Sequence, residues 1–175
     1  MRYIGSMFEV LVFVYENYWR GDACPQQQHL QRKLNAVGFD NEEIEQALVW
    51  LGALGQATRE TRLAAAEGIT TAAAARDAQQ VLQQSPGSMR IYSVQEQNVL
   101  GPQCLGFISF LECAGVLPAH MREVVVDRAM ASNTDPLALD DLKIIVLMVY
   151  WSYGEEPDAL VLDELCDEAE GRVGH

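Results

Sequence analysis

The strongest pattern of apolar positions lies toward the C-terminal end, where eight consecutive apolar residues occupy positions 144–151. Asp140 and Asp141 precede this run, and either of them is a good N-cap for a helix. A membrane-spanning helix needs about 20 apolar residues, so the run is too short to cross a bilayer. Four apolar residues in and just before it recur at helical spacing, namely Leu142, Ile145, Met148 and Val149. The pattern therefore predicts a helix that the core surrounds on every side.

The N-terminal third predicts three helices, the second and third joined by a tight turn. Residues 7–20 are apolar apart from a narrow polar stripe. The next helix starts near Pro25 and stops at Gly38. Its apolar stripe is Leu30, Leu34 and Val37. Asp40 then caps a new helix, with Glu43 three residues later as in a capping box. The core face of that helix is Ile44, Ala47, Leu48 and Leu51. This region resembles a helix-turn-helix unit.

Residues 56–88 differ from their surroundings, because they contain nine alanines and few large apolar side chains. An isolated helix of this composition is marginal in water. We therefore expect a connector with some helix, and a boundary between two modules. Beyond it, residues 90–94 are the one strand candidate, while residues 103–117 and 119–131 have helical periodicity. The inward-facing residues of these two helices are expected to be Leu105, Ile108, Leu111, Met121, Val124, Val125 and Ala129.

Taken together, the patterns predict an all-α protein with at most one short strand near residues 90–94. A helix-turn-helix-like N-terminal unit is expected to be joined to a C-terminal helical bundle. The expected divisions are a leader or upstream start at 1–6, the N-terminal unit at 7–55, the connector at 56–88, the bundle at 89–153 and an acidic C-terminal segment at 154–175.

The charge balance narrows the classes of partner. The chain has 12 basic and 25 acidic residues, which gives a formal net charge of −13. The excess lies in residues 89–175, which hold 5 basic and 15 acidic side chains. Such a chain repels phosphate backbones and anionic lipid, so its charge argues against direct binding to nucleic acid or to a membrane surface. A basic protein partner is electrostatically matched to it.

The cysteines and histidines give no sign of a metal site or of catalysis. No two of the four cysteines have the short spacing of a zinc site. Because a signal-peptide pattern is also missing, we expect reduced thiols and a cytoplasmic protein. Cys104 and Cys113 are candidate nucleophiles if folding brings His120 to one of them, but buried structural thiols are favoured. We expect no catalytic, metal-binding or cofactor-binding residues, and hence no enzyme.

Three groups of residues in the C-terminal half leave alternatives open. Asp140 and Asp141 suit an acid–base pair, although a helix cap is favoured. The aromatic residues within 150–153 suit a binding pocket, although the core is favoured. Arg128 pairs with charged neighbours on its own helix in one interpretation, and with Asp140 or Asp141 across two packed helices in the other.

A small basic cluster supports nucleic-acid binding as an alternative function. Its members lie on the first helix of the helix-turn-helix-like unit, and they are His29, Arg32 and Lys33. In such motifs the second helix enters the major groove. The exposed residues expected on that helix are Glu42, Glu43 and Glu45. Carboxylates facing phosphates oppose binding, so the direct nucleic-acid alternative is the less favoured one.

The acidic C-terminal segment is the strongest candidate for a functional site in this chain. It holds eight acidic residues and no basic one between positions 155 and 170. A charge run of this kind is typical of a solvated tail, but interleaved leucines also suit docking on a basic groove. The candidate partner-binding residues are Glu155, Glu156, Asp158, Leu160, Asp163, Glu164, Asp167 and Glu168.

Several separated blocks of the chain resemble one family. The stretches MFEVLVFVYENY, RIYS, MREVVVDRAM and LALDDLKIIVLMVYW occur in an order similar to that of the bacterial Smg family. The resemblance covers most of residues 7–151 and implies a small cytoplasmic protein without an assigned activity. Genes of this family often neighbour genes for DNA-processing and topoisomerase proteins. We therefore expect a non-enzymatic protein-interaction module with a basic protein partner, and the gene context that the resemblance implies links this partner to DNA processing or topology, as in a DNA-processing enzyme. The resemblance supplies no site residues, and neither the partner nor the oligomeric state follows from it.

Overall fold

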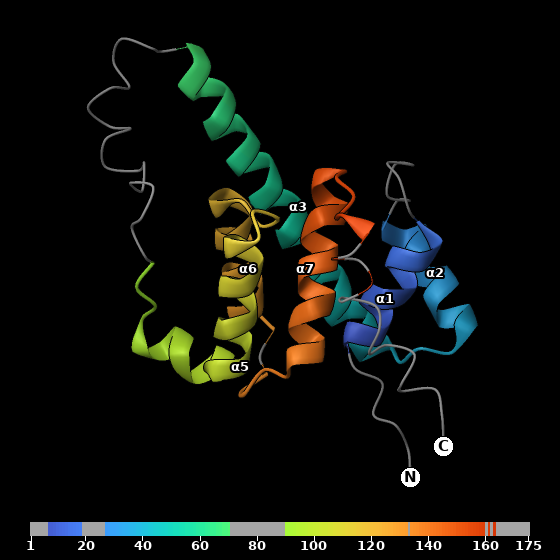
Figure 1. Cartoon of the computed structure of the whole chain (residues 1–175). Coiled ribbons are helices and arrows are strands. Elements are labelled where there is room, and N and C mark those ends of the chain that lie inside the picture. The colour runs from blue at the N-terminus through green and yellow to red at the C-terminus, as the bar shows by residue number, and fades with distance from the viewer. Residues whose placement is uncertain are drawn as a thin grey trace.

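The computed structural model describes residues 7–18, 27–70, 90–132 and 134–159, together with residues 161 and 163. Every regular element among these residues is a helix, so the predicted all-α class is confirmed. Figure 1 shows the arrangement of these helices. They are α1 (Met7–Asn17), α2 (Gln27–Val37), α3 (Asn41–Thr70), α5 (Val94–Cys113), α6 (Ala119–Met130) and α7 (Leu139–Tyr153).

Helix α7 is the central element, as its apolar run predicts. Nine of its 15 residues are buried, and the helix contacts α1, α3, α5 and α6. The N-cap is Ala138, so the expected cap at Asp140 or Asp141 is wrong by two or three residues. Both aspartates lie in the first turn instead, where a negative charge is favourable beside the positive end of the helix dipole. The prediction of a core helix is confirmed.

Helix α3 is longer than the sequence pattern suggests. It includes Gly52 and Gly55 and continues to Thr70, so the first 15 residues of the expected connector are helical. Figure 1 shows it passing behind α7 and extending beyond the end of α6. The hydroxyls of Thr58 and Ser152 are 2.6 Å apart, and Arg62 donates to the carbonyl of Tyr153 at the end of α7. Residues 71–88 of the expected connector lie outside the described residues.

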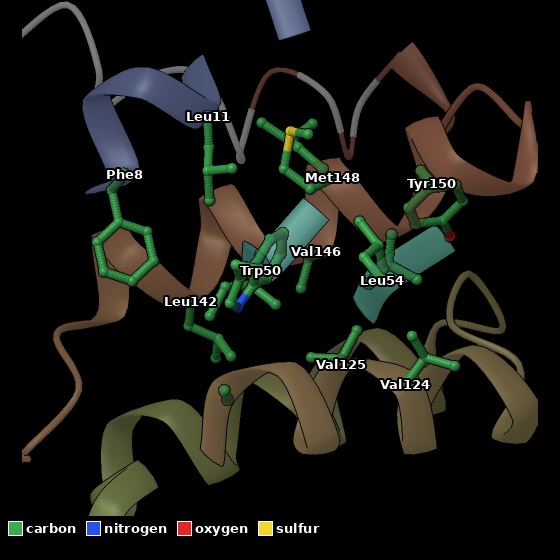
Figure 2. Close-up of a cluster of buried hydrophobic side chains, with 14 of the residues drawn as sticks. Phe8, Leu11, Trp50, Leu54, Val124, Val125, Leu142, Val146, Met148 and Tyr150 are labelled. Atoms are coloured by element: carbon green, nitrogen blue, oxygen red, sulfur yellow. The ribbon is translucent and has the colours of Figure 1, made fainter. Parts of the chain in front are cut away.

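The described helices share one hydrophobic core. Its cluster contains buried residues from all six of them. Figure 2 shows Trp50 and Leu54 of α3 lying between Val146 of α7 and Val125 of α6. The indole Nε1 of Trp50 also donates to the carbonyl of Arg128, at 3.1 Å. Residues on the two sides of the expected module boundary are therefore packed together.

The strand candidate at residues 90–94 is wrong, because a helix start replaces it. Ser93 is the N-cap of α5, and its hydroxyl accepts from the N–H of Glu96 at 3.2 Å. The N–H of Ser93 donates in return to the carboxylate of Glu96, at 2.8 Å. This reciprocal pair is a capping box, whose Ser-x-x-Glu signal outweighs the strand preference of Ile91 and Val94.

The expected core faces of α5 and α6 agree with the structure at most positions. Six of the seven expected inward residues are buried, and Leu105 is half-buried. Helix α5 is kinked at Gly101, whose φ of 69° lies in the left-handed region, and Pro102 follows. In the N-terminal unit, Val37 is 55% exposed, so its expected place in the core is wrong. Helices α2 and α3 pack together across the turn at Gly38, and a DNA-binding helix-turn-helix geometry stays a prediction.

Candidate interaction site

The acidic candidate site begins where α7 ends. Gly154 is the C-cap in the left-handed conformation (φ 69°, ψ 22°), and its N–H donates to the carbonyls of Trp151 and Tyr150. The next N–H, that of Glu155, donates to the carbonyl of Tyr150 at 3.1 Å. This arrangement satisfies the last carbonyls of the helix and turns the chain back toward the core.

Beyond this turn, apolar side chains point inward and acidic side chains point outward. Pro157 is buried, and Val161 packs against the core cluster. The exposed acidic residues of the same stretch are Glu155, Glu156, Asp158 and Asp163. We call these four residues the acidic site. The described part of the acidic segment therefore lies on the fold and presents its carboxylates at the surface.

The acidic site influences the helix beneath it. Burial raises the pKa of the Tyr150 phenol, and the negative charge of Glu155 raises it further. The phenol donates to the carbonyl of Val116 and stays protonated at neutral pH.

Four of the predicted partner-binding residues lie outside the described part of the chain, namely Leu160, Glu164, Asp167 and Glu168.

The basic cluster of the alternative hypothesis is exposed on α2. His29, Arg32 and Lys33 all lie at the surface, at helical spacing that places them on one side of the helix. The ammonium of Lys33 is 5.1 Å from the ring centre of Tyr18. Across the turn, α3 exposes Glu42 and Glu45. Glu43 is half-buried instead, because its carboxylate accepts from the N–H of Asp40 at 3.4 Å, as the capping pattern predicts.

The thiol and imidazole candidates for catalysis are separate. Cys104 is buried and donates to the carbonyl of Leu137, with a sulfur–oxygen distance of 3.5 Å. Burial raises the pKa of the Cys104 thiol to about 11, and the charge of Asp141 contributes. Cys113 is exposed, so its expected burial is wrong. His120 packs its ring edgewise against Tyr153, and within the described structure it bonds to neither thiol.

The aromatic residues near the end of α7 pack in or against the core, and a binding pocket lined by them stays a prediction. Tyr153 is buried, and its ring packs edge-to-face with that of His120. The indole Nε1 of Trp151 donates to the carbonyl of Tyr18 at 3.0 Å, which ties α7 to the end of α1. Among the described residues, no group of three His, Cys, Asp or Glu side chains could hold a metal ion.

An ionic network around two arginines was not foreseen from the sequence. Arg122 is 4% exposed and bonds to both Glu112 and Glu123. Arg90 bonds to Glu123 at 2.8 Å and to Glu96 at 2.9 Å. Burial lowers the pKa of Arg122, but the bonds to Glu112 and Glu123 outweigh burial and raise it overall. The network fastens both ends of α5 to the start of α6.

Arg128 pairs with the nearest carboxylate on its own helix. Its guanidinium lies 2.6 Å from Asp127, which confirms the interpretation of a pair with a charged neighbour on its own helix. Asp127 directly precedes Arg128 in α6, so this pair forms without any contribution from α7. Such a half-exposed pair contributes under about 1 kcal/mol to stability.

The fold and the site define a small all-α protein with one shared core and a surface acidic site. None of the helices in the described residues combines the length and the apolar content needed to cross a bilayer. The family described as "Protein of unknown function (DUF494)" matches residues 7–175.

Curated relatives agree with this match over almost the full length. The "Protein Smg homolog" of Methylibium petroleiphilum is 54% identical over 169 residues, which is 97% of this chain and 100% of the relative. The homolog of Leptothrix cholodnii is 55% identical over 169 residues, and that of Herminiimonas arsenicoxydans is 45% identical over 172 residues, with the same coverage. The chain belongs to the Smg family. These names state no enzymatic activity, and no solved structure matches the chain.

Proposed function

We propose that this Smg-family chain is a non-enzymatic, cytoplasmic protein-interaction module. Its acidic site, Glu155, Glu156, Asp158 and Asp163, docks on a basic surface of a protein partner. The link to DNA processing or topology rests on the gene context that the family resemblance implies. A DNA-processing enzyme fits this proposal, because its DNA-facing surface is basic and complementary to carboxylates.

The observation that carries the proposal is the anchoring of the acidic site. Pro157 is buried and Val161 packs on the core, while the four carboxylates around them are exposed. A free tail loses conformational entropy when it binds, whereas an anchored segment has lost part of it already. Clustered charges of one sign also steer an oppositely charged partner and speed association at low salt.

The non-enzymatic part of the proposal is supported by what the candidate catalytic groups do instead. The thiol of Cys104 is hydrogen-bonded inside the core, and His120 packs against Tyr153. A nucleophile needs a base within hydrogen-bond reach. Cys104 and His120 each make a packing contact or hydrogen bond with another residue, which supports a structural role for both side chains.

Affinity capture with matched baits tests the proposal. The test bait carries Glu155→Gln, Glu156→Gln, Asp158→Asn and Asp163→Asn. The control bait carries four neutralised glutamates elsewhere on the described surface, namely Glu9→Gln, Glu16→Gln, Glu42→Gln and Glu45→Gln. Both baits change the net charge by the same amount. Wild type and control should recover one stoichiometric protein partner from the lysate after nuclease treatment, and the test bait should lose it. Equal recovery by all three baits contradicts docking at the acidic site.

Direct nucleic-acid binding is the second candidate, favoured by one observation. Helix α2 holds no acidic residue and exposes His29, Arg32 and Lys33. Binding of this kind predicts an affinity for DNA or RNA that falls steeply with salt and disappears in the variant Arg32→Glu/Lys33→Glu. The exposed Glu42 and Glu45 on α3 argue against it. Partners that nuclease removes from the capture experiment would favour this candidate over the first.

A further inference from the structure

The basic cluster on α2 and the acidic site beyond α7 meet at one tyrosine, although they are far apart in sequence. Tyr18 follows α1, and its ring centre lies 5.1 Å from the ammonium of Lys33. The carbonyl of Tyr18 accepts from the indole Nε1 of Trp151, in the last turn of α7, at 3.0 Å. The acidic site begins at Glu155, two residues after that helix ends. One tyrosine and one tryptophan therefore separate the two charged clusters, on the side of α7 where Figure 1 shows α1 and α2.

Both aromatic side chains between the clusters are partly exposed. The hydrogen bond fixes the indole of Trp151, and the ring of Tyr18 is held by the ammonium of Lys33. Tyrosine and tryptophan are among the residues that most often carry the binding energy of protein interfaces, and polar groups form the rim around them. We call Tyr18, Trp151, the basic cluster and the acidic site together the mixed-charge surface. Its composition is that of an interface between proteins.

The charges of this surface disfavour an occupant of one sign. Helix α2 contains no acidic residue, and among the described residues neither Arg32 nor Lys33 pairs with a carboxylate. A uniformly basic protein surface that reached across Tyr18 would face these cations, and like charges across an interface cost energy. A nucleic acid has the opposite difficulty, because phosphates drawn to the cations would face the carboxylates of the acidic site.

We propose that the mixed-charge surface is one continuous interface, and that its occupant is a protein whose basic patch is bordered by carboxylates. The lysines or arginines of the partner face the acidic site, and its Asp or Glu side chains face Arg32 and Lys33. This inference rests on the proposed docking of the acidic site, and it adds the feature that selects the partner. Complementary charges of both signs fix the register of two surfaces and exclude partners of uniform charge.

The first test determines what lies against α2 by photo-cross-linking in lysate, with and without nuclease. The photoreactive amino acid p-benzoylphenylalanine replaces Ala36, an exposed residue one turn after Arg32 and Lys33, so that both cations are retained. It replaces Asp163 in a second protein and the exposed Glu60 of α3 in a control. Mass spectrometry should identify the same protein at positions 36 and 163. Its cross-linked peptide should be rich in Asp and Glu at position 36 and rich in Lys and Arg at position 163, and position 60 should give no such adduct.

The second test reverses one cation. Arg32→Glu should lower the yield of the adduct at position 163 severalfold, because a carboxylate then faces the carboxylates of the partner. The matched control is Arg59→Glu, the same change at an exposed arginine of α3, and it should leave the yield unchanged. A synthetic decalysine peptide is the uniformly basic probe. Its affinity should not fall in Arg32→Glu, since this change only makes the surface more acidic.

Each outcome decides the proposal. The same partner at positions 36 and 163, with a yield that Arg32→Glu lowers and Arg59→Glu does not, supports it. An adduct at position 163 alone overturns the mixed-charge interface and leaves the docking of the acidic site intact. Nucleic acid, a different protein or a segment of this chain at position 36 overturns it too, and so does weaker decalysine binding in Arg32→Glu. No adduct at either position overturns this inference together with the proposed function.

Discussion

A leucine deep in α3 provides the sharpest test of the shared core. Leu54 is 1% exposed and lies between Val146 of α7 and Val125 of α6 (Figure 2). The sequence pattern suggested that the chain divides near this position, whereas the structure packs Leu54 against the second half. Truncating its side chain should therefore destabilise the whole fold and not only the N-terminal helices.

The expected loss of stability in Leu54→Ala follows from the burial of the leucine side chain. Leu54→Ala removes the equivalent of about three buried methylene groups, each worth about 0.8 kcal/mol in transfer free energy. The cavity that remains adds to this, so the free energy of unfolding should fall by about 2–5 kcal/mol. Since the total stability of a domain is about 5–15 kcal/mol, this loss is a large fraction of it.

Urea denaturation followed by two probes measures the effect. Far-ultraviolet circular dichroism reports all helices, and tryptophan fluorescence includes the buried Trp50. The two midpoints should coincide in wild type and should move down together in Leu54→Ala. Leu63→Ala is the matched control, because Leu63 lies on the same helix and is 62% exposed. It should change the free energy of unfolding by less than about 0.5 kcal/mol.

Two results would refute this reasoning. One is an equal loss of stability in Leu54→Ala and Leu63→Ala, which would mean that α3 is not packed as described. The other is a transition that splits in two, with the circular dichroism and fluorescence midpoints apart. That splitting would show that the two halves of the chain unfold independently.

Two further predictions concern local conformation and pH. Gly52 lies inside α3 with open space at the Cβ position, so Gly52→Ala should raise the free energy of unfolding by about 0.5–1 kcal/mol. Gly154 has a φ of 69°, so Gly154→Ala should lower the free energy of unfolding by about 1–2 kcal/mol. Thermal melting temperatures that shift in the same direction for both variants would contradict the assigned backbone. The hydrogen bond from Arg90 lowers the pKa of Glu96 despite burial, so the unfolded state takes up the proton first as pH falls below about 4.3. The stability that Glu96 contributes is complete above this pH and is lost as pH falls through the lower pKa of the folded state. The urea midpoint should therefore decrease more steeply with falling pH in wild type than in Glu96→Gln. Urea midpoints that decrease in parallel in the two proteins would contradict this.

Elements with a strong local signal were predictable from the sequence. The apolar run of α7 could only be accommodated inside the core, and its neighbours Met121, Val125 and Ala129 on α6 occupy the expected positions. Periodicity predicted these positions correctly because apolar residues at helical spacing define the face of the helix that is buried in the core. The exposure of the acidic site was equally readable from its charge.

Features that depend on distant contacts were not predictable. The extension of α3 is held by partners such as Ser152 and Tyr153, nearly a hundred residues away in sequence, whereas an isolated helix of its length is marginal in water. The burial of Arg122 depends on Glu112 of another helix, which the sequence around Arg122 does not reveal. The capping box at Ser93 was a local signal, and Ser-x-x-Glu would have identified it.

The central claim is that the acidic site contacts a basic surface of a protein partner. Site-specific photo-cross-linking tests it most directly, with the photoreactive amino acid p-benzoylphenylalanine placed at Asp163 and, as a control, at the exposed Glu60 of α3. We expect a covalent adduct from position 163 in nuclease-treated lysate, with the cross-linked peptide of the partner rich in lysine and arginine. An adduct from position 60 alone, or attachment of position 163 to an acidic or purely apolar surface, would contradict the account.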